Sequence, residues 1–194
     1  FFSSRNRKNL KKERRKIAEQ DLEIKRFTGN KISLDVVDDF YSFYVDTHLR
    51  RSGHSGYLNK DFFEEITKTI ADNILIILAY KNGRAVAGSF FFYDQNNLYG
   101  RYWGASNDFD ALHFECCYYQ GIDFCIEKNI KRFDPGVQGE HKIKRGFEPT
   151  FTFSSHWIEN HDFSLAISDF LLREDKYIKD YHQDASTLLP FKNI

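Results

Sequence analysis

Polar side chains capable of proton transfer and anion binding are concentrated in residues 112–147. An ordinary core segment holds few such groups, because burial destabilises charged and unpaired polar side chains. Their density predicts general acid–base chemistry on a substrate that carries an anionic group. The residues concerned are His113, Glu115, Gln120, Asp134, Gln138, Glu140, His141, Lys142 and Arg145.

The sequence Gly139-Glu-His-Lys142 is the part of this segment best suited to catalysis. It follows a predicted strand end, and loops at such positions commonly carry catalytic side chains. We predict Glu115, Glu140 and His141 as catalytic residues, with one of the two glutamates as the base. Lys142 is predicted to stabilise an oxyanion or a phosphate. Alternatively, His141 is a structural histidine whose ring is satisfied by neighbouring groups.

Further side chains are predicted to bind substrate or cofactor. Arg101 lies in a predicted strand, where an arginine is unusual unless it meets an anion or a carboxylate such as that of Asp134. His113 and Gln120 share the outer side of the predicted helix 111–128. The predicted binding residues are Arg101, Trp103, His113, Gln120, Gln138, Lys142 and Arg145.

Three cysteines, Cys116, Cys117 and Cys125, lie in that same predicted helix. Cys117 and Cys125 are about 12 Å apart along it, beyond the roughly 7 Å that a disulfide allows between Cα atoms. We therefore expect free thiols and a reducing, cytoplasmic compartment. A helical wheel puts Cys117 and Cys125 on the buried face and Cys116 on the outer face. No second ligand pair has zinc spacing, so no metal site is predicted.

The 194 residues are enough for one domain with a hydrophobic core. The net charge is zero, yet residues 1–20 hold eight Lys or Arg against two Glu, which gives them +6 and leaves −6 on the remainder. We predict a basic helical arm or interdomain linker over 1–20 and a single domain over 21–194. Such an arm suits tRNA phosphates or anionic lipid head groups, or is simply a solvated helix. The longest apolar run, 74–80, has strand length, so no membrane span is predicted.

Apolar periodicity predicts the elements that position these residues. Helical spacing predicts helices over 6–20, 33–50, a segment after Asn59, 111–128 and 162–181. Alternation predicts strands over 22–27, 73–80, 84–93, 98–104, 131–134 and 150–158, with a hairpin at Asn82-Gly83. A helix connects strands 98–104 and 131–134, so these two should be parallel. The predicted fold class is α/β (α+β), with a mixed, mainly antiparallel sheet flanked by helices.

This order of elements resembles the fold of the GNAT acyltransferase superfamily. Lys142–Pro149 resembles the turn that enters the sixth strand of many such enzymes. Leu98-Tyr-Gly-Arg-Tyr-Trp-Gly104, His113–Glu127 and Gln138–Phe147 resemble signature segments of the bacterial FemAB-like, "peptidoglycan biosynthesis/recognition" branch. Residues 4–15 also resemble that branch, where they precede the second of two tandem GNAT-like units. The resemblance implies a preceding GNAT-like domain outside this sequence, and it places His54 beside the acceptor site or on the surface.

One loop differs from the acetyl-CoA-binding members of the superfamily. Those carry Arg/Gln-x-x-Gly-x-Gly/Ala after the fourth strand, whereas this sequence reads Gly104-Ala-Ser-Asn-Asp-Phe-Asp110. It lacks the glycines that let N–H groups close on a pyrophosphate, and Asp108 and Asp110 would repel one. Fem-type relatives use an aminoacyl ester of tRNA. We therefore expect no tightly bound cofactor and an acyl donor that is either aminoacyl-tRNA or acyl-CoA.

The resemblance implies an N-acyltransferase that moves an acyl or aminoacyl group to a primary amine, such as that of a cell-wall peptide precursor. A second hypothesis is a non-catalytic module that recognises a peptide or muropeptide on the same scaffold. A third is an acetyl-CoA-dependent N-acetyltransferase with an atypical pyrophosphate loop. For the first, Arg101 and residues 138–142 are expected to face a shared cleft where the fourth and fifth strands part.

Overall fold

The computed structural model describes residues 2–137 and 139–192. Its internal contacts divide the chain into two compact units, one of residues 9–137 and one of residues 1–8 with 138–194. No helix in the described ranges is long and apolar enough to span a membrane.

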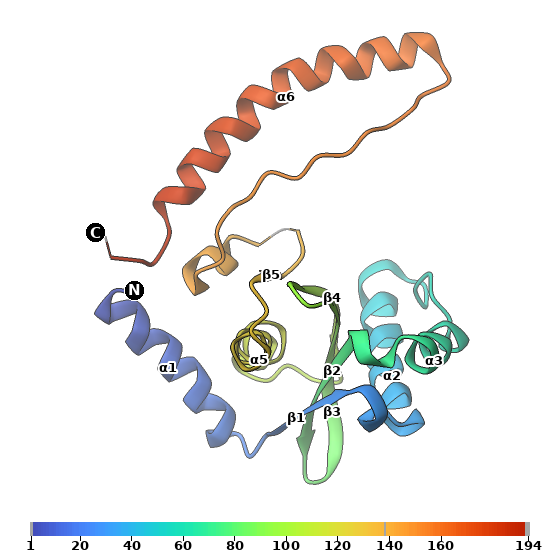
Figure 1. Ribbon diagram of the computed structural model, residues 1–194, viewed down its shortest axis with the longest axis vertical. Coiled ribbons are helices and arrows are strands. Elements are labelled where there is room, and N and C mark those ends of the chain that lie inside the picture. The colour runs from blue at the N-terminus through green and yellow to red at the C-terminus, as the bar shows by residue number, and fades with distance from the viewer. Residues whose placement is uncertain (1, 138, 193–194) are drawn as a thin grey trace. The chain divides into compact units, whose positions relative to one another are not determined.

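The larger unit contains a five-stranded sheet in the order β1-β2-β3-β4-β5 (Figure 1). All neighbouring strands are antiparallel except β4 and β5, which are parallel, as the intervening helix predicts. The mixed, mainly antiparallel sheet of the predicted fold class is therefore confirmed. The strands are β1 Glu23–Thr28, β2 Ile74–Lys81, β3 Arg84–Tyr93, β4 Asn97–Ala105 and β5 Arg132–Asp134.

Helices flank both faces of this sheet, with α2 and α3 on one face and α5 on the other (Figure 1). The helix predicted to begin at Ser33 is capped by that residue, whose side chain accepts a hydrogen bond from the Val36 N–H, and Asn59 accepts one from the Phe62 N–H at the start of the next helix. The helices are α1 Ser4–Glu19, α2 Leu34–Ser52, α3 Lys60–Thr69, α4 Leu112–Phe114 and α5 Gln120–Lys128, with 3-10 turns η1 Gly29–Lys31 and η2 Ala71–Asn73.

The core forms two layers separated by the sheet. Successive residues of β2 point to opposite faces, so Leu75 and Ile77 pack with α5 while Ile74 and Ile76 pack with α2 and α3. The strand is apolar throughout because helices cover both of its faces. It joins β3 through the predicted hairpin, in which Asn82 and Gly83 both adopt positive φ, 52° and 75°.

The helix predicted over 111–128 contains one π-helical turn, η3 Glu115–Tyr119, between α4 and α5. A π turn adds a residue to the helix and so rotates the residues on its two sides relative to a regular wheel. As a result Cys116 is completely buried, whereas Cys117 is only half-buried. The predicted assignment of Cys116 to the outer face and Cys117 to the core is therefore wrong.

Thiol labelling tests this rotation. Burial raises the pKa of Cys116 well above its ordinary value and that of Cys125 to about 11, so both remain protonated and shielded at pH 8. We expect a thiol reagent to modify Cys117 alone in the folded protein, and three thiols after denaturation, as counted by mass spectrometry with peptide mapping. Modification of Cys116 before Cys117 would contradict the π turn.

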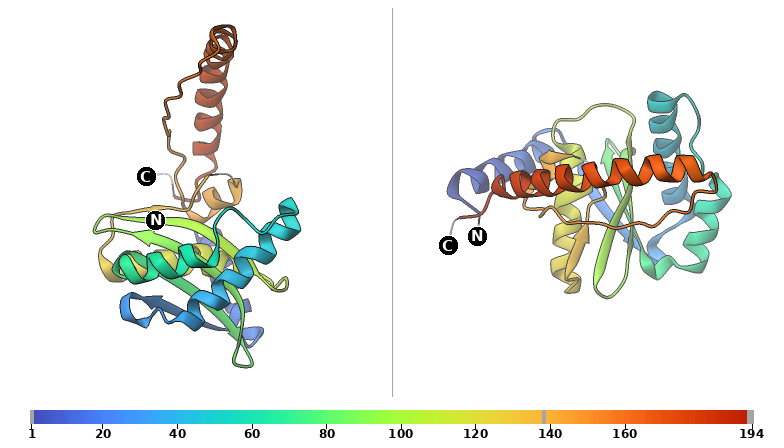
Figure 2. Two further views of the ribbon diagram at one scale, coloured as in Figure 1. Left: turned by 90° about the vertical axis from the view of Figure 1, so that its right-hand side faces the viewer. Right: turned by 90° about the horizontal axis from the view of Figure 1, so that it is seen from above.

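The smaller unit ends in a long helix, α6 His161–Thr187, preceded by the 3-10 turn η4 Glu140–Arg145. An extended segment between them runs beside α6 (Figure 2). The strand predicted over 150–158 is absent from the described chain: these residues have an alternating sequence but join no strand ladder. Alternation alone does not make a strand, since the backbone groups need a partner. The side chains of Phe153 and Trp157 are 92% and 83% exposed.

Close packing of α2 on β4 depends on Gly104. A Cβ atom there would lie 2.2 Å from the backbone oxygen of Phe43, whereas a Cβ on Gly100, in the same strand, would make ordinary contacts at 3.5 Å or more. We expect Gly104→Ala to lower the free energy of unfolding by about 1–3 kcal/mol, measured by urea denaturation. The matched variant Gly100→Ala should differ far less from the parent, and equal losses would contradict this account.

Candidate functional site

Strands β4 and β5 stay paired over only three residues each. Asn97–Tyr99 pairs with Arg132–Asp134, and the next residue of β5 is Pro135, which has no N–H to continue the ladder. Within the described residues, positions 100–105 of β4 therefore have no strand neighbour on this side. The pairing ends in the region where the resemblance predicts a gap for the acyl donor.

A β-bulge places Arg101 at this parted edge. Phe90 pairs with Tyr102 and Phe91 pairs with Gly100, so Arg101 is the extra residue of the bulge. Its side chain is exposed, and its guanidinium carbon lies 5.7 Å from the centre of the Tyr102 ring. The carboxylate of Asp134 accepts a hydrogen bond from the Gly136 N–H instead of pairing with Arg101.

Trp103 and His113 lie against each other, with ring centres 5.4 Å apart, and the His113 ring is also 5.4 Å from that of Tyr118. Trp103 packs on the core layer formed with α5. The structure thus brings together two residues of the predicted binding set, one from β4 and one from the helix that follows it.

Glu115 is buried and its carboxylate is fully engaged. It accepts hydrogen bonds from Arg14 Nε at 3.2 Å, Arg14 Nη2 at 2.9 Å and Gln120 Nε2 at 2.8 Å. The hydrogen bonds of Arg14 to Asp123 and Glu115 raise its pKa despite partial burial of the guanidinium. These three hydrogen bonds fix the carboxylate in place and direct its oxygens toward Arg14 and Gln120. The geometry therefore favours a structural role for Glu115 and Gln120. Gln120 orients the Glu115 carboxylate, and that carboxylate holds α1 against the helical segment 112–128.

Lys16 of α1 and Gln20, the residue after this helix, hold the loop between β4 and α4. Gln20 Nε2 donates to the backbone oxygen of Asp110 at 2.9 Å, and the Asp110 N–H donates to Gln20 Oε1 at 3.0 Å. Lys16 forms an ion pair with the Asp110 carboxylate at 2.5 Å, which raises the pKa of Lys16. Ala111 has a positive φ of 62°. Gln20 thus occupies the Asp110 N–H, in the loop where the acetyl-CoA-binding members of the superfamily carry their pyrophosphate-binding glycines.

Four predicted residues of the smaller unit share the turn η4. Glu140 accepts a hydrogen bond from the Tyr181 hydroxyl at 3.3 Å, and the buried Arg145 donates to the backbone oxygen of His141 at 2.8 Å. Partial desolvation lowers the pKa of His141, with further contributions from the charges of Arg145 and Lys142. This shift favours the neutral imidazole, the form that a general base requires. Gln138 lies outside the described residues.

A row of rings runs from the β4 bulge to the loop between α2 and α3. The ring centres of Tyr102 and Tyr44 are 5.2 Å apart, those of Tyr44 and His48 are 4.3 Å apart, and His54 continues the row at 6.0 Å from His48. Tyr57 ends it, 5.0 Å from His54. Sequence reasoning singled out His54 and missed His48. The available signal was the one-turn spacing of Tyr44 and His48 just before a loop with two glycines.

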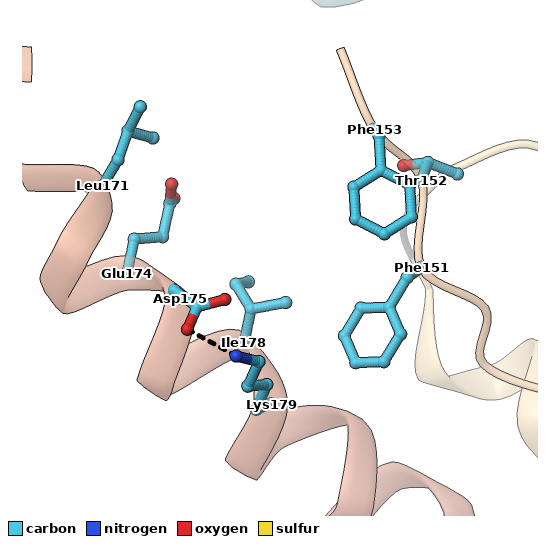
Figure 3. A pocket seen from close by; sticks show the side chains of 8 residues that line it. All are labelled: Phe151, Thr152, Phe153, Leu171, Glu174, Asp175, Ile178 and Lys179. Carbon is cyan, nitrogen blue, oxygen red and sulfur yellow. Dashed lines mark hydrogen bonds and ion pairs between the residues drawn. The ribbon is translucent and has the colours of Figure 1, made fainter. Parts of the chain in front are cut away.

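The smaller unit has an open hollow of about 350 Å³ between the extended segment and α6 (Figure 3). Phe151 and Phe153 face Leu171 and Ile178 across it, and Lys179 pairs with its helical neighbour Asp175 at 2.6 Å. None of the predicted site residues lines this hollow. In the part of the chain that the structure describes, no three His, Cys, Asp or Glu side chains are grouped to hold a metal ion.

A family model described as peptidoglycan biosynthesis/recognition, FemAB-like, matches residues 1–193. The chain belongs to the FemAB-like family. No curated protein matches it. This FemAB-like chain is similar to a possible acetyltransferase from Clostridium difficile 630, with 13% identity, 72% of this chain and 99% of that chain covered, and a TM-score of 0.53.

Two other structures resemble the FemAB-like chain. An aminoglycoside acetyltransferase from an uncultured soil metagenomic sample, in complex with sisomicin, has 12% identity and a TM-score of 0.50 over 74% of this chain and 98% of that one. L-PGS from Bacillus licheniformis has 14% identity and a TM-score of 0.52 over 70% of this chain and 42% of that one. At these identities the likeness shows the fold, which is that of the GNAT acyltransferases.

Replacing Arg14 tests the role of the buried carboxylate. Arg14→Gln leaves Glu115 buried without its cation, so we expect the free energy of unfolding to fall by about 1–2 kcal/mol, reduced by the partial exposure of Arg14. Arg15→Gln, on the exposed side of the same helix, should change it by less than about 0.5 kcal/mol. Urea denaturation measures both. Equal stability of the two variants would remove the structural role assigned to Glu115.

Proposed function

We propose that this FemAB-like chain is an N-acyltransferase that transfers an aminoacyl group from an ester of tRNA to a primary amine of a cell-wall peptide precursor. The closed β4–α4 loop is the observation that carries this choice of donor. Gln20 and Lys16 already occupy the backbone and carboxylate of Asp110, in the loop that by resemblance would have to bind the pyrophosphate of an acyl-CoA. An aminoacyl ester needs no such site.

The basic face of α1 supports the same donor. Arg14 and Lys16 are engaged in ion pairs, but other cations of this helix remain exposed. Such a stripe suits phosphates of a nucleic-acid backbone, which are bound chiefly by Lys and Arg. Aminoacyl-tRNA is a cytoplasmic donor, so the proposal assigns the reaction to the cytoplasm. The exposed cations outside those ion pairs are Arg5, Arg7, Lys8, Lys11, Lys12 and Arg15.

The turn η4 supplies the proposed acid–base chemistry. His141 has a lowered pKa and is the preferred base for the amine proton, while Glu140 is the second candidate. Loss of this proton frees the amine lone pair to attack the ester carbonyl. Lys142 is assigned to the developing oxyanion, and the tRNA ribose oxygen leaves with the electrons of the broken ester bond and takes up a proton.

Transfer assays separate the possible donors. The chain is incubated with a primary-amine acceptor and either aminoacyl-tRNA or acetyl-CoA, and the product is measured by mass spectrometry. We expect mass addition with aminoacyl-tRNA only, and thermal stabilisation by that ligand but not by acetyl-CoA. Acetylation at a comparable rate would contradict the donor assignment. Stabilisation by a muropeptide without transfer from either donor would favour the non-catalytic recognition module, which the engagement of Glu115 also suits.

The pH profile tests His141. Because its pKa is lowered from the ordinary 6.5, the neutral base should predominate above that pH and kcat/KM should fall only at lower pH. We expect His141→Ala to reduce kcat/KM by about 100-fold or more and to abolish this acid limb, with little change in melting temperature. Glu148→Ala, an exposed carboxylate just after the turn, serves as the control. An unchanged acid limb in the His141 variant would exclude it as the base.

A further inference from the structure

Three aromatic side chains of α6 form an exposed row along one side of this helix. Phe163, Phe170 and Tyr177 recur every seven residues, a spacing that keeps side chains on the same side. These residues are 57%, 51% and 67% exposed. Exposed apolar side chains gathered in this way mark a contact site for another molecule. We call these three residues the aromatic row.

The extended segment of the smaller unit covers a different side of α6. The hollow between the two is lined by Leu171 and Ile178 and by none of the three residues of the aromatic row (Figure 3). Each of these two residues follows a member of the row by one position, which places it about 100° further round the helix. A second helix can therefore lie along the row without displacing the extended segment.

The charges of α6 favour pairing with an identical helix that runs in the opposite direction. Residues 161–170 hold two Asp and no Lys or Arg, a charge of −2. Residues 171–179 hold three Lys or Arg against two acidic residues, a charge of +1. Antiparallel copies bring the acidic stretch of each helix beside the cationic stretch of the other, whereas parallel copies in register place like charge beside like charge. Such surface charges select the orientation of a contact more than its strength.

We propose that the aromatic row joins two copies of this chain, with their α6 helices antiparallel and Phe170 on the two-fold axis. Phe163 of one copy then meets the partner's Tyr177, since each lies seven residues from Phe170. All the rings of the row are thus paired, and aromatic pairs stabilise interfaces beyond the area that they bury. Glu174, half-buried between Phe170 and Tyr177, lies at the level of the partner's Ala166. In a parallel pair it would face a second Glu174, and such a buried polar residue selects helix orientation.

The size of this contact limits its strength. With about half of its surface exposed, each ring contributes about 100 Å², so the six rings of the two copies bury about 600 Å². Flanking side chains must supply the rest of the roughly 1,000 Å² that specific interfaces exceed. We therefore expect a reversible dimer with a Kd in the micromolar range. The contact uses the same surface on both copies, so it closes at two.

Sedimentation equilibrium over a range of protein concentrations tests the pairing. We expect the mass to rise from the 23.0 kDa of one chain toward twice that value. Phe170→Glu sets two carboxylates against each other on the axis and should weaken the dimer by about tenfold or more. The matched control is Leu172→Glu, because Leu172 is 78% exposed and lies about 200° round the helix from Phe170.

The control variant should dimerise like the parent chain. A monomer at every concentration, or equal weakening by Phe170→Glu and Leu172→Glu, would overturn the proposal. Circular dichroism verifies that α6 stays helical. If Phe170→Glu loses helix, Tyr177→Ala decides the question, since it removes a ring from both outer pairs and should weaken the dimer severalfold.

Disulfide cross-linking tests the orientation. Under mild oxidation, a mixture of Phe163→Cys and Tyr177→Cys should form a disulfide between positions 163 and 177 of the two copies, whereas either variant alone should not. Peptide mapping separates this bond from any disulfide of the half-buried Cys117. Cross-linking of each variant with itself would contradict the antiparallel arrangement. The inference goes beyond the proposed function, and neither experiment measures acyl transfer, so each proposal can fail while the other stands.

Discussion

The need to neutralise a buried carboxylate organises the larger unit of this chain. The π turn rotates Glu115 into the interior, where its charge is tolerated only with hydrogen-bonding partners. Arg14 supplies the cation, and this ion pair holds α1 against the helical segment 112–128. Lys16 and Gln20, further along the same segment, then reach Asp110 and close the β4–α4 loop. The choice of acyl donor that we propose follows from this sequence of contacts.

Much of the fold could be predicted from residue patterns because each pattern has a local physical cause. Caps at Ser33 and Asn59, the Asn82-Gly83 turn and the apolar strand β2 all act through neighbours in sequence. The π turn and the bulge at Arg101 could not be predicted in this way, because each depends on how the segment packs against others. The alternating segment 150–158 failed as a strand for the related reason that pairing needs a second chain segment.

The candidate functional site likewise combines features that residue patterns predict with features that depend on contacts between distant segments. Sequence reasoning selected the polar residues of η4 and, separately, Trp103 and His113, since density of reactive side chains is visible in the sequence, whereas the ring contact between Trp103 and His113 is known only from the structure. It assigned catalysis to Glu115, whose ion pair with Arg14 joins residues far apart in the sequence. It also passed over His48, because a histidine within an amphipathic helix has no special pattern.

The uncovered apolar side chains of residues 150–158 affect how this protein behaves in solution. Phe153 and Trp157 stand in a stretch without Lys, Arg, Asp or Glu, so nothing in it opposes edge-to-edge association with an identical segment. Such windows, rich in aromatic residues and poor in charge, are typical starting points of cross-β aggregates. We therefore expect the isolated chain to associate at high concentration, and a charged residue introduced at position 153 to act as a gatekeeper against this association.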